Sequence, residues 1–249
     1  VIGLGLAVPC PVKNGFVSQC ANLSWENIHV INQMKKALPE HVNVVVSNDA
    51  NSAAYGENMI LEKPYQNAIF YTLGTGVGGG IILNGNIYEG TTGMAGEIGH
   101  MKIFGGLEDQ PCGCGAQGCL EQVCGNQGIV RFAKQMLTNH ESLLNDGREL
   151  SVKHIFEAAQ LGDSVATSIV NRVAEHIAVS ASVLAVVLDP EAFIIGGGIA
   201  KAGRFLIDKI EYYYKQNARF STGKIPFVLA KTQNEAGIYG AAQLAKKKQ

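Results

Sequence analysis

The sequence has little of what several classes of protein require. Charged residues make up only 16% of the chain and the net charge is −1, so no overall basic field draws it to nucleic acid or anionic lipid. The longest apolar run, 177–188, is shorter than the roughly 20 residues that span a bilayer, and it contains two serines. We therefore expect a globular protein with a small neutral or anionic ligand and no membrane or nucleic-acid partner.

Cysteine is also sparse, and its pattern bears on the compartment. Three of the six cysteines lie in one short segment, while Cys10, Cys20 and Cys124 are too scattered to predict a disulfide framework, so we expect a reducing, cytoplasmic location. The first residues, VIGLGLAVPCP, have no basic residues before them and no initiator Met. We interpret them as a strand and expect the chain to begin partway into a longer protein.

Hydrophobic periodicity predicts an α/β protein of one or two lobes. The beginning of the chain has a βαβ-like pattern, and its short apolar strands are typical of a sheet that is covered on both faces. Strands are predicted at 1–8, 42–46, 68–73, 80–83, 192–195 and 225–230. Helices are predicted at 27–38, 51–61, 151–161, 164–188 and 236–248.

One loop carries a set of metal-ligand residues, namely His100, Cys112, Cys114 and Cys119. Zinc prefers four thiolate or imidazole ligands in a tetrahedron, and the intervening glycines allow a short loop to fold three sulfurs around one ion. Neighbouring thiolates repel and need a cation between them, which favours a structural Cys3His zinc site over a chance cluster. Zinc on one nitrogen of His100 would fix the ring and leave the other nitrogen facing a hydroxyl.

Two other segments have the composition of a ligand site. Asn48 and Asp49 directly follow a predicted strand, at the end where open α/β sheets bind ligands, although Asp49 could instead cap the next helix. The glycine turn at 74–79 can bring backbone N–H groups close to a phosphate, but by itself it is equally compatible with a Gly-rich β-hairpin. Glu97 and Glu121 flank the metal pattern, and solvated loop acids are the alternative for both.

Four segments in this order resemble the ROK family of bacterial sugar kinases and sugar-responsive repressors. They are NDAN at 48–51, LGTGVGGGII at 73–82, EGTTGMAGEIGHM at 89–101 and CGCGAQGCLE at 112–121. The resemblance runs from Val1 to the last helix. It implies an α/β, actin-like ATPase (ribonuclease H-like) sugar kinase fold with two lobes and a structural zinc loop. We expect a small lobe of residues 1–47 and 236–249, and a large lobe of residues 48–235 with the sugar site and the zinc loop.

The same resemblance assigns roles to particular residues. It implies that Asp49 is the catalytic base and that sugar hydroxyls are bound by Asn48, Glu97, His100 and Glu121. It implies a nucleotide site at Thr75, Gly76, Gly196, Gly197 and Gly198. ATP with Mg²⁺ and a structural Zn²⁺ are the implied cofactors, and a homodimer or homotetramer is expected. The CGCGAQGCLE form of the zinc loop is similar to that of the family's glucokinases and implies glucose as the acceptor, with N-acetylmannosamine, N-acetylglucosamine and allose left open.

Two departures from the family pattern keep other hypotheses open. The Asp-x-Gly-Gly-Thr phosphate hairpin has no match here, so either an upstream segment supplies it or the chain cannot catalyse alone. Pro9-Cys10-Pro11 stands where the family typically has Pro-Gly-Pro, which leaves the sugar preference in question. A sugar-responsive repressor with an upstream DNA-binding domain is the second hypothesis, and an inactive sugar-binding paralogue is the third. Retention of Asp49 and LGTGVGGG favours the kinase.

Overall fold

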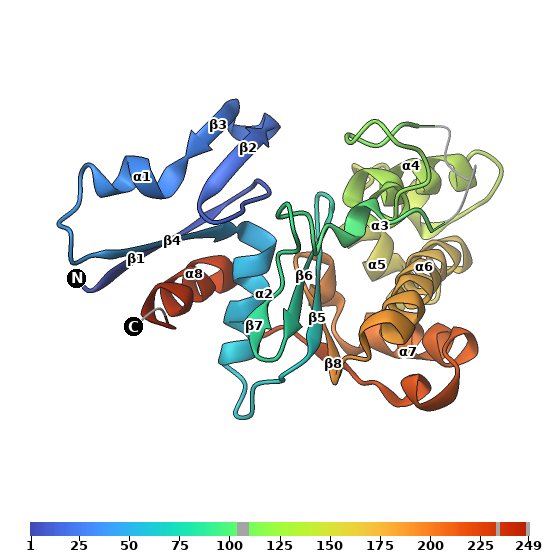
Figure 1. Cartoon of the computed structure of the whole chain (residues 1–249). Coiled ribbons are helices and arrows are strands. Elements are labelled where there is room, and N and C mark those ends of the chain that lie inside the picture. The colour runs from blue at the N-terminus through green and yellow to red at the C-terminus, as the bar shows by residue number, and fades with distance from the viewer. Residues whose placement is uncertain (104–109, 233–234, 248–249) are drawn as a thin grey trace. The chain divides into compact units, whose positions relative to one another are not determined.

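The structure is a computed structural model that describes residues 1–103, 110–232 and 235–247 of the 249-residue chain (Figure 1). It divides into two packing units. Unit 1 contains residues 1–71, 78–97 and 230–249, and unit 2 contains residues 72–77 and 98–229. This division differs from the predicted lobes because the segment after residue 48 packs mainly with the first strands and the last helix.

Unit 1 begins with a parallel strand pair and ends with the C-terminal helix. Its strands are β1 (Gly3–Val8), β2 (Phe16–Cys20), β3 (Trp25–His29), β4 (Asn43–Asn48), β5 (Ala68–Leu73), β6 (Val77–Leu83) and β7 (Asn86–Ile87). Its helices are α1 (Val30–Lys35), α2 (Asp49–Met59) and α8 (Ala236–Lys247), with the 3-10 turn η1 (Ala21–Leu23). The boundary between the units runs through β5 and β6. The predicted end of the last helix, Lys248, lies outside the described residues.

The βαβ-like prediction for the first strands is confirmed, because β1 and β4 are parallel neighbours. Val8 pairs with Asn48 at the end of both strands, so the carboxyl ends of β1 and β4 meet. Helix α8 lies against β1 and α2 (Figure 1). The contact is between backbones: a Cβ at Gly5 of β1 would overlap the carbonyl of Ala241, and a Cβ at Gly240 would overlap the carbonyl of Ser52 in α2.

The predicted helix at 27–38 is wrong at its beginning. Residues 25–29 form β3, which pairs with β2 in an antiparallel hairpin, and only Val30–Lys35 is helical. Asn27 has a φ of 52°, a left-handed value that a right-handed helix cannot contain. The apolar spacing of Ile28, Ile31 and Met34 looked helical because all three pack against the same core cluster from a strand and then from a helix.

The scattered positions of Cys10 and Cys20 predicted no disulfide framework, and the structure corrects this. The two sulfurs form a disulfide between the segment after β1 and the last residue of β2. Both residues are buried in the apolar cluster of Val8, Val12 and Val17. The fold brings the two cysteines together by turning the chain back between β1 and β2, which the spacing of ten residues alone did not indicate.

Unit 2 is mostly helical. Its helices are α3 (Glu121–Cys124), α4 (Asn126–Leu137), α5 (Val152–Gln160), α6 (Ser164–Leu188) and α7 (Arg204–Asn217). Its strands are β8 (Ala192–Gly196) and β9 (Phe227–Leu229), which run parallel, and its 3-10 turns are η2 (Ile98–His100), η3 (Leu143–Asn145), η4 (Ile199–Ala202) and η5 (Phe220–Lys224). The sequence analysis predicted α5 and α6 but not α4 or α7.

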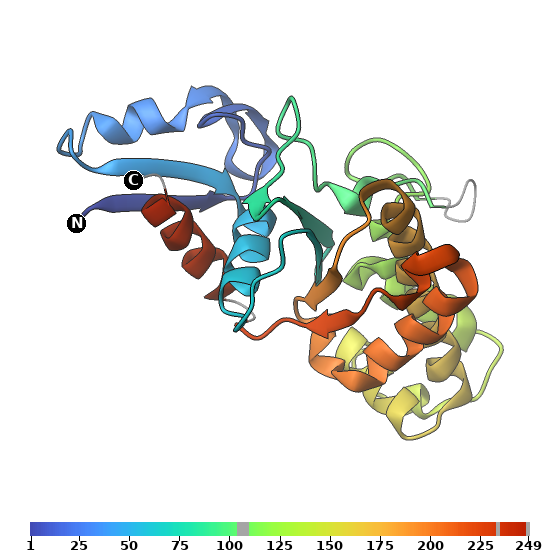
Figure 2. The same ribbon diagram turned by 60° about the horizontal axis from the view of Figure 1, so that its bottom comes forward.

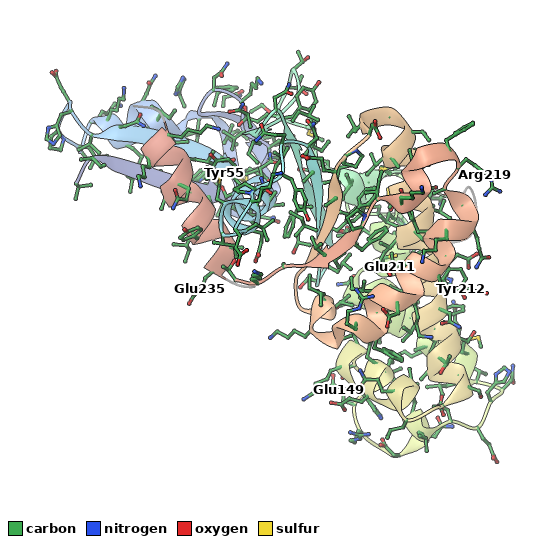
Figure 3. All side chains as sticks on the ribbon, turned by 90° about the horizontal axis from the view of Figure 1, so that it is seen from below. Tyr55, Glu149, Glu211, Tyr212, Arg219 and Glu235 are labelled. Carbon is green, nitrogen blue, oxygen red and sulfur yellow. A yellow bond between two sulfur atoms is a disulfide. The ribbon has the colours of Figure 1, made fainter. Side chains whose placement is uncertain are left out.

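Helix α6 is the centre of unit 2. It packs against α5 and α7, which Figure 2 shows beside it. Its length and composition would allow it to cross a membrane, but 61% of its most apolar window is buried inside the structure, as expected for a core helix. Helix α7 buries Leu206, Ile210 and Tyr214, whereas Tyr212, labelled in Figure 3, is exposed. The core of unit 2 therefore consists mainly of packed helices.

Candidate functional site

Asp49 is the first residue of α2, directly after the carboxyl end of β4. The side-chain amide of Asn48 makes two hydrogen bonds: its Oδ1 accepts from Asn51 N (3.1 Å), and its Nδ2 donates to Cys10 O (3.3 Å). Asn48, not Asp49, therefore caps the helix, which removes the simplest structural explanation for Asp49. One Asp49 oxygen accepts from Ala50 N at 2.8 Å, and the carboxylate stays accessible at the surface.

The surroundings of Asp49 alter its acidity. Burial of the carboxyl among protein atoms raises its pKa above the usual range, and backbone hydrogen bonds oppose the shift only in part. The side chain is nevertheless exposed by area, so the group is partly desolvated and reachable. A reachable carboxylate of raised basicity can accept a proton from a hydroxyl.

Glu97 belongs to the same unit as Asp49. It follows Gly96, whose φ is +96° and whose added Cβ would lie 3.2 Å from Asn51 Oδ1. The backbone just before Glu97 therefore lies against Asn51 in the first turn of α2. Asn48 and Asp49 are adjacent at the start of that helix, so the predicted residues of unit 1 lie on two segments that touch at Gly96 and Asn51.

The predicted metal ligands come together in unit 2. The ligand atoms of His100, Cys112, Cys114 and Cys119 all lie within 4.8 Å of one another. The Cys114 and Cys119 sulfurs are 3.7 Å apart, and Cys112 Sγ is 3.4 Å from His100 Nδ1. Zn–S bonds of about 2.3 Å at tetrahedral angles imply S···S edges of about 3.8 Å, so the donor set fits a zinc ion.

The electrostatics of the cluster also favour a cation. Burial raises the pKa of the Cys119 thiol to about 12, and hydrogen bonds from the other two thiols add to the effect. Burial likewise raises the pKa of Cys112. Three thiolates at this place therefore require a bound positive charge. His100 presents Nδ1 to the cysteines, so Nε2 is the nitrogen on the other side of the ring.

Glu121 connects the metal loop with the glycine turn between β5 and β6. Its Oε2 accepts from Val77 N at 3.0 Å, and its Oε1 lies 3.8 Å from Cys112 Sγ. A Cβ at Gly76 would overlap Oε2 and lie 2.9 Å from the carboxyl carbon, so a larger residue there would displace the Glu121 carboxylate. Gly74 N donates to Gly76 O (3.0 Å), which closes the turn that contains Thr75.

The second predicted glycine segment lies beside the first. Gly196 ends β8, and Gly197 has a φ of +85°. A Cβ at Gly197 would lie 2.6 Å from Leu73 N and 2.8 Å from Leu73 C, whereas Gly198 has open space around it. The predicted residues of unit 2 thus form a second neighbourhood of two glycine turns, Glu121 and the metal cluster.

The sequence analysis missed one residue of the unit 1 neighbourhood. Cys10 holds Asn48 through its carbonyl oxygen, and its side chain is tied down by the disulfide to Cys20. Cys10 did stand out in the sequence, because Pro9-Cys10-Pro11 differs from the family's Pro-Gly-Pro, but this difference suggested an effect of its side chain on the sugar site. In the structure the Cys10 side chain is buried, and its backbone carbonyl makes the contact with Asn48.

Comparison with known proteins identifies the class. The sequence profile of the ROK family matches residues 1–248, and the chain belongs to this family. Its fold is the actin-like ATPase fold of ROK sugar kinases, as predicted. A glucokinase from Halalkalibacterium halodurans is 38% identical over 263 residues, which cover 100% of this chain and 77% of that protein.

One similar solved structure contains two bound compounds. It is a ROK family glucokinase from Streptomyces griseus in complex with glucose and AMPPNP, with 34% identity and a TM-score of 0.82, covering 99% of this chain and 82% of that one. The family also contains regulators: a xylose repressor from Caldicellulosiruptor bescii is 29% identical over 252 residues, or 96% of this chain and 61% of the repressor.

Proposed function

We propose that this chain catalyses the ATP-dependent phosphorylation of glucose to glucose 6-phosphate. The observation that carries the proposal is the 34% identity, over 99% of the chain, to a glucokinase solved with glucose and an ATP analogue. The glucokinase of Halalkalibacterium halodurans supports the same acceptor. Other hexoses and N-acetylhexosamines remain the alternative acceptors.

In the proposed reaction, Asp49 accepts the proton of the sugar hydroxyl as the oxygen attacks the γ-phosphate of MgATP. Its place after β4, its exposure and its raised pKa support this role. Asn48 and Glu97 are proposed to bind sugar hydroxyls in unit 1, with His100 and Glu121 doing so in unit 2. Backbone N–H groups at Thr75 and Gly76, together with the turn at 196–198, are proposed to bind the nucleotide. Zn²⁺ is the proposed occupant of the Cys3His cluster, where it would orient His100.

The location and assembly are part of the proposal. We propose a cytoplasmic homo-oligomer because the proposed reaction consumes ATP, whereas the Cys10–Cys20 disulfide removes the support that the cysteine pattern gave to this location. Three exposed valines near the end of α6 are the apolar surface that we propose a second copy covers. They are Val183, Val186 and Val187.

The test compares the wild-type chain with Asp49→Asn, which keeps the size and much of the hydrogen bonding of the side chain. Glucose phosphorylation is followed by a coupled assay, and glucose binding is followed by calorimetry. We expect kcat to fall by about 10²- to 10⁴-fold with little change in glucose affinity, since a base acts mainly in the transition state. Sugar binding by the wild type without any turnover would instead support the repressor or the inactive paralogue.

A further inference from the structure

The position of Glu121 is set by the metal loop. Glu121 follows the ligand Cys119 by two residues. The chain before it is hydrogen-bonded to the chain after His100: Leu120 N donates to Met101 O (2.9 Å), and Cys119 forms a bridge with Lys102. A metal that holds His100 and Cys119 would therefore also hold the backbone at Glu121.

The side chain of Glu121 in turn holds the glycine turn. Its Oε2 accepts from the Val77 amide, and a Cβ at Gly76 would displace the carboxylate from this place. The turn has a second support, since Asn126 N at the start of α4 donates to Gly74 O (2.9 Å). The amides of Gly74 and Val77 are engaged within the protein, so phosphate contacts at this turn fall to Thr75 and Gly76.

We propose that Glu121 is a positioning residue through which the metal cluster fixes the Thr75–Gly76–Val77 turn for the phosphates of ATP. This inference rests on the proposed function and adds a second role to the sugar contact proposed for Glu121. A carboxylate has room for both, because its two oxygens accept up to four hydrogen bonds. Loss of the metal is then expected to weaken nucleotide binding as well as sugar binding.

The first experiment measures the turn without any ligand. Amide hydrogen exchange is followed for peptides that contain Val77 in the wild type, Glu121→Ala, Glu121→Gln and the control Gln122→Ala. A hydrogen bond to a charged acceptor is worth enough that its removal should speed local exchange by about ten- to a hundredfold in Glu121→Ala. Glu121→Gln keeps an acceptor oxygen and should show a smaller effect. Gln122→Ala alters the same short helix and should leave the turn protected.

The second experiment tests the connection to the metal. A zinc chelator should speed exchange at the turn in the wild type, but it should add little in Glu121→Ala if the metal acts through this side chain. The affinity for a non-hydrolysable ATP analogue, measured without sugar, should fall in parallel. Equal effects of the chelator in the wild type and in Glu121→Ala would overturn the proposal, as would unchanged exchange in Glu121→Ala.

The readouts separate this inference from the proposed function. A wild-type chain that binds no ATP analogue, but shows the expected exchange pattern, would reject the kinase and leave the connection in place. If Glu121→Ala does not fold, amide exchange at the turn is instead compared among the wild type, Glu121→Gln and the wild type treated with the chelator. Metal content and circular dichroism of each variant show whether it is folded and loaded.

Discussion

Replacing Gly240 with Ala should destabilise the protein, although alanine is the better helix former. A Cβ at Gly240 would overlap the Ser52 carbonyl oxygen and lie 2.7 Å from the Ser52 carbonyl carbon and 2.8 Å from Gly56 N. Ordinary contacts require roughly 3.5 Å, so α8 and α2 would have to separate by on the order of 1 Å. These obstacles are backbone atoms of a helix, which cannot rotate away as a side chain can.

The magnitude follows from two opposing contributions. Alanine in place of glycine favours the helix by about 1 kcal/mol, whereas overpacking typically costs about 1–3 kcal/mol and more against backbone. We expect a net loss of about 2 kcal/mol in the free energy of unfolding, or a decrease of about 4–8 °C in Tm for a chain of this size. Thermal unfolding followed by circular dichroism measures the change.

The same helix offers a matched control. Gly237 lies one turn earlier in α8, and among the described residues an added Cβ would have only Asp49 O nearby, at 3.7 Å. Gly237→Ala should therefore leave the protein as stable as the wild type, or more stable by up to about 1 kcal/mol. A Gly240→Ala variant that unfolds at or above the wild-type temperature would refute the close packing of α2 and α8.

Four further predictions concern groups described above. As the pH falls, kcat/KM should decrease with an apparent pKa above the ordinary Asp value of about 3.9. The reason is that burial raises the pKa of Asp49, and the carboxyl is protonated and inactive as a base at pH values below that pKa. A pH–rate profile measures the apparent pKa. Alkylation without reductant, read by mass spectrometry, should leave Cys10 and Cys20 unmodified, and replacing both with Ser should cost about 2–3 kcal/mol because the closed loop is short. Asp163→Ala should lower the free energy of unfolding by about 1 kcal/mol, since Asp163 caps α6. Burial raises the pKa of Asp163, but hydrogen bonds outweigh it and lower the pKa, so this stabilisation is present at pH 7 and is lost as the pH falls through the lowered pKa. Urea unfolding at pH 7 and pH 3 measures the difference. Elemental analysis should find about one zinc per chain, and Cys114→Ser should reduce it.

The sequence predicted the elements that have a strong local pattern. Helix α6 was predicted with its observed bounds because a long apolar periodicity ends at Asp189-Pro190, where Asp189 adopts a left-handed conformation. Strand β5 and the parallel pairing of β1 with β4 followed from continuous apolar runs. The β2–β3 hairpin was missed because it depends on positive φ at Ser24 in the connection and at Asn27 within β3, residues that give no strong signal of their own.

The candidate site was predictable at the level of residue identity. The spacing of His100, Cys112, Cys114 and Cys119 predicted a cluster of metal-ligand atoms, and the structure brings these four residues together. The contacts among the parts were not predictable, because they join residues far apart in the chain: Glu121 to Val77, and Asn48 to Cys10. Such pairs depend on tertiary packing, about which a motif carries no information.

The close contact of α8 with both β1 and α2 limits how this protein can be altered. Backbone touches backbone at Gly5, at Gly56 and at Gly240, so at these three positions there is no room for a side chain. The Tyr55 ring of α2, labelled in Figure 3, lies 5.3 Å from Lys247 Nζ at the far end of the same helix pair. A library designed to change the acceptor sugar would do best to leave these glycines fixed and vary the exposed loops. Any shift of α8, which begins at Ala236, would be passed directly to the helix that begins with Asp49, although the two helices lie far apart in the sequence.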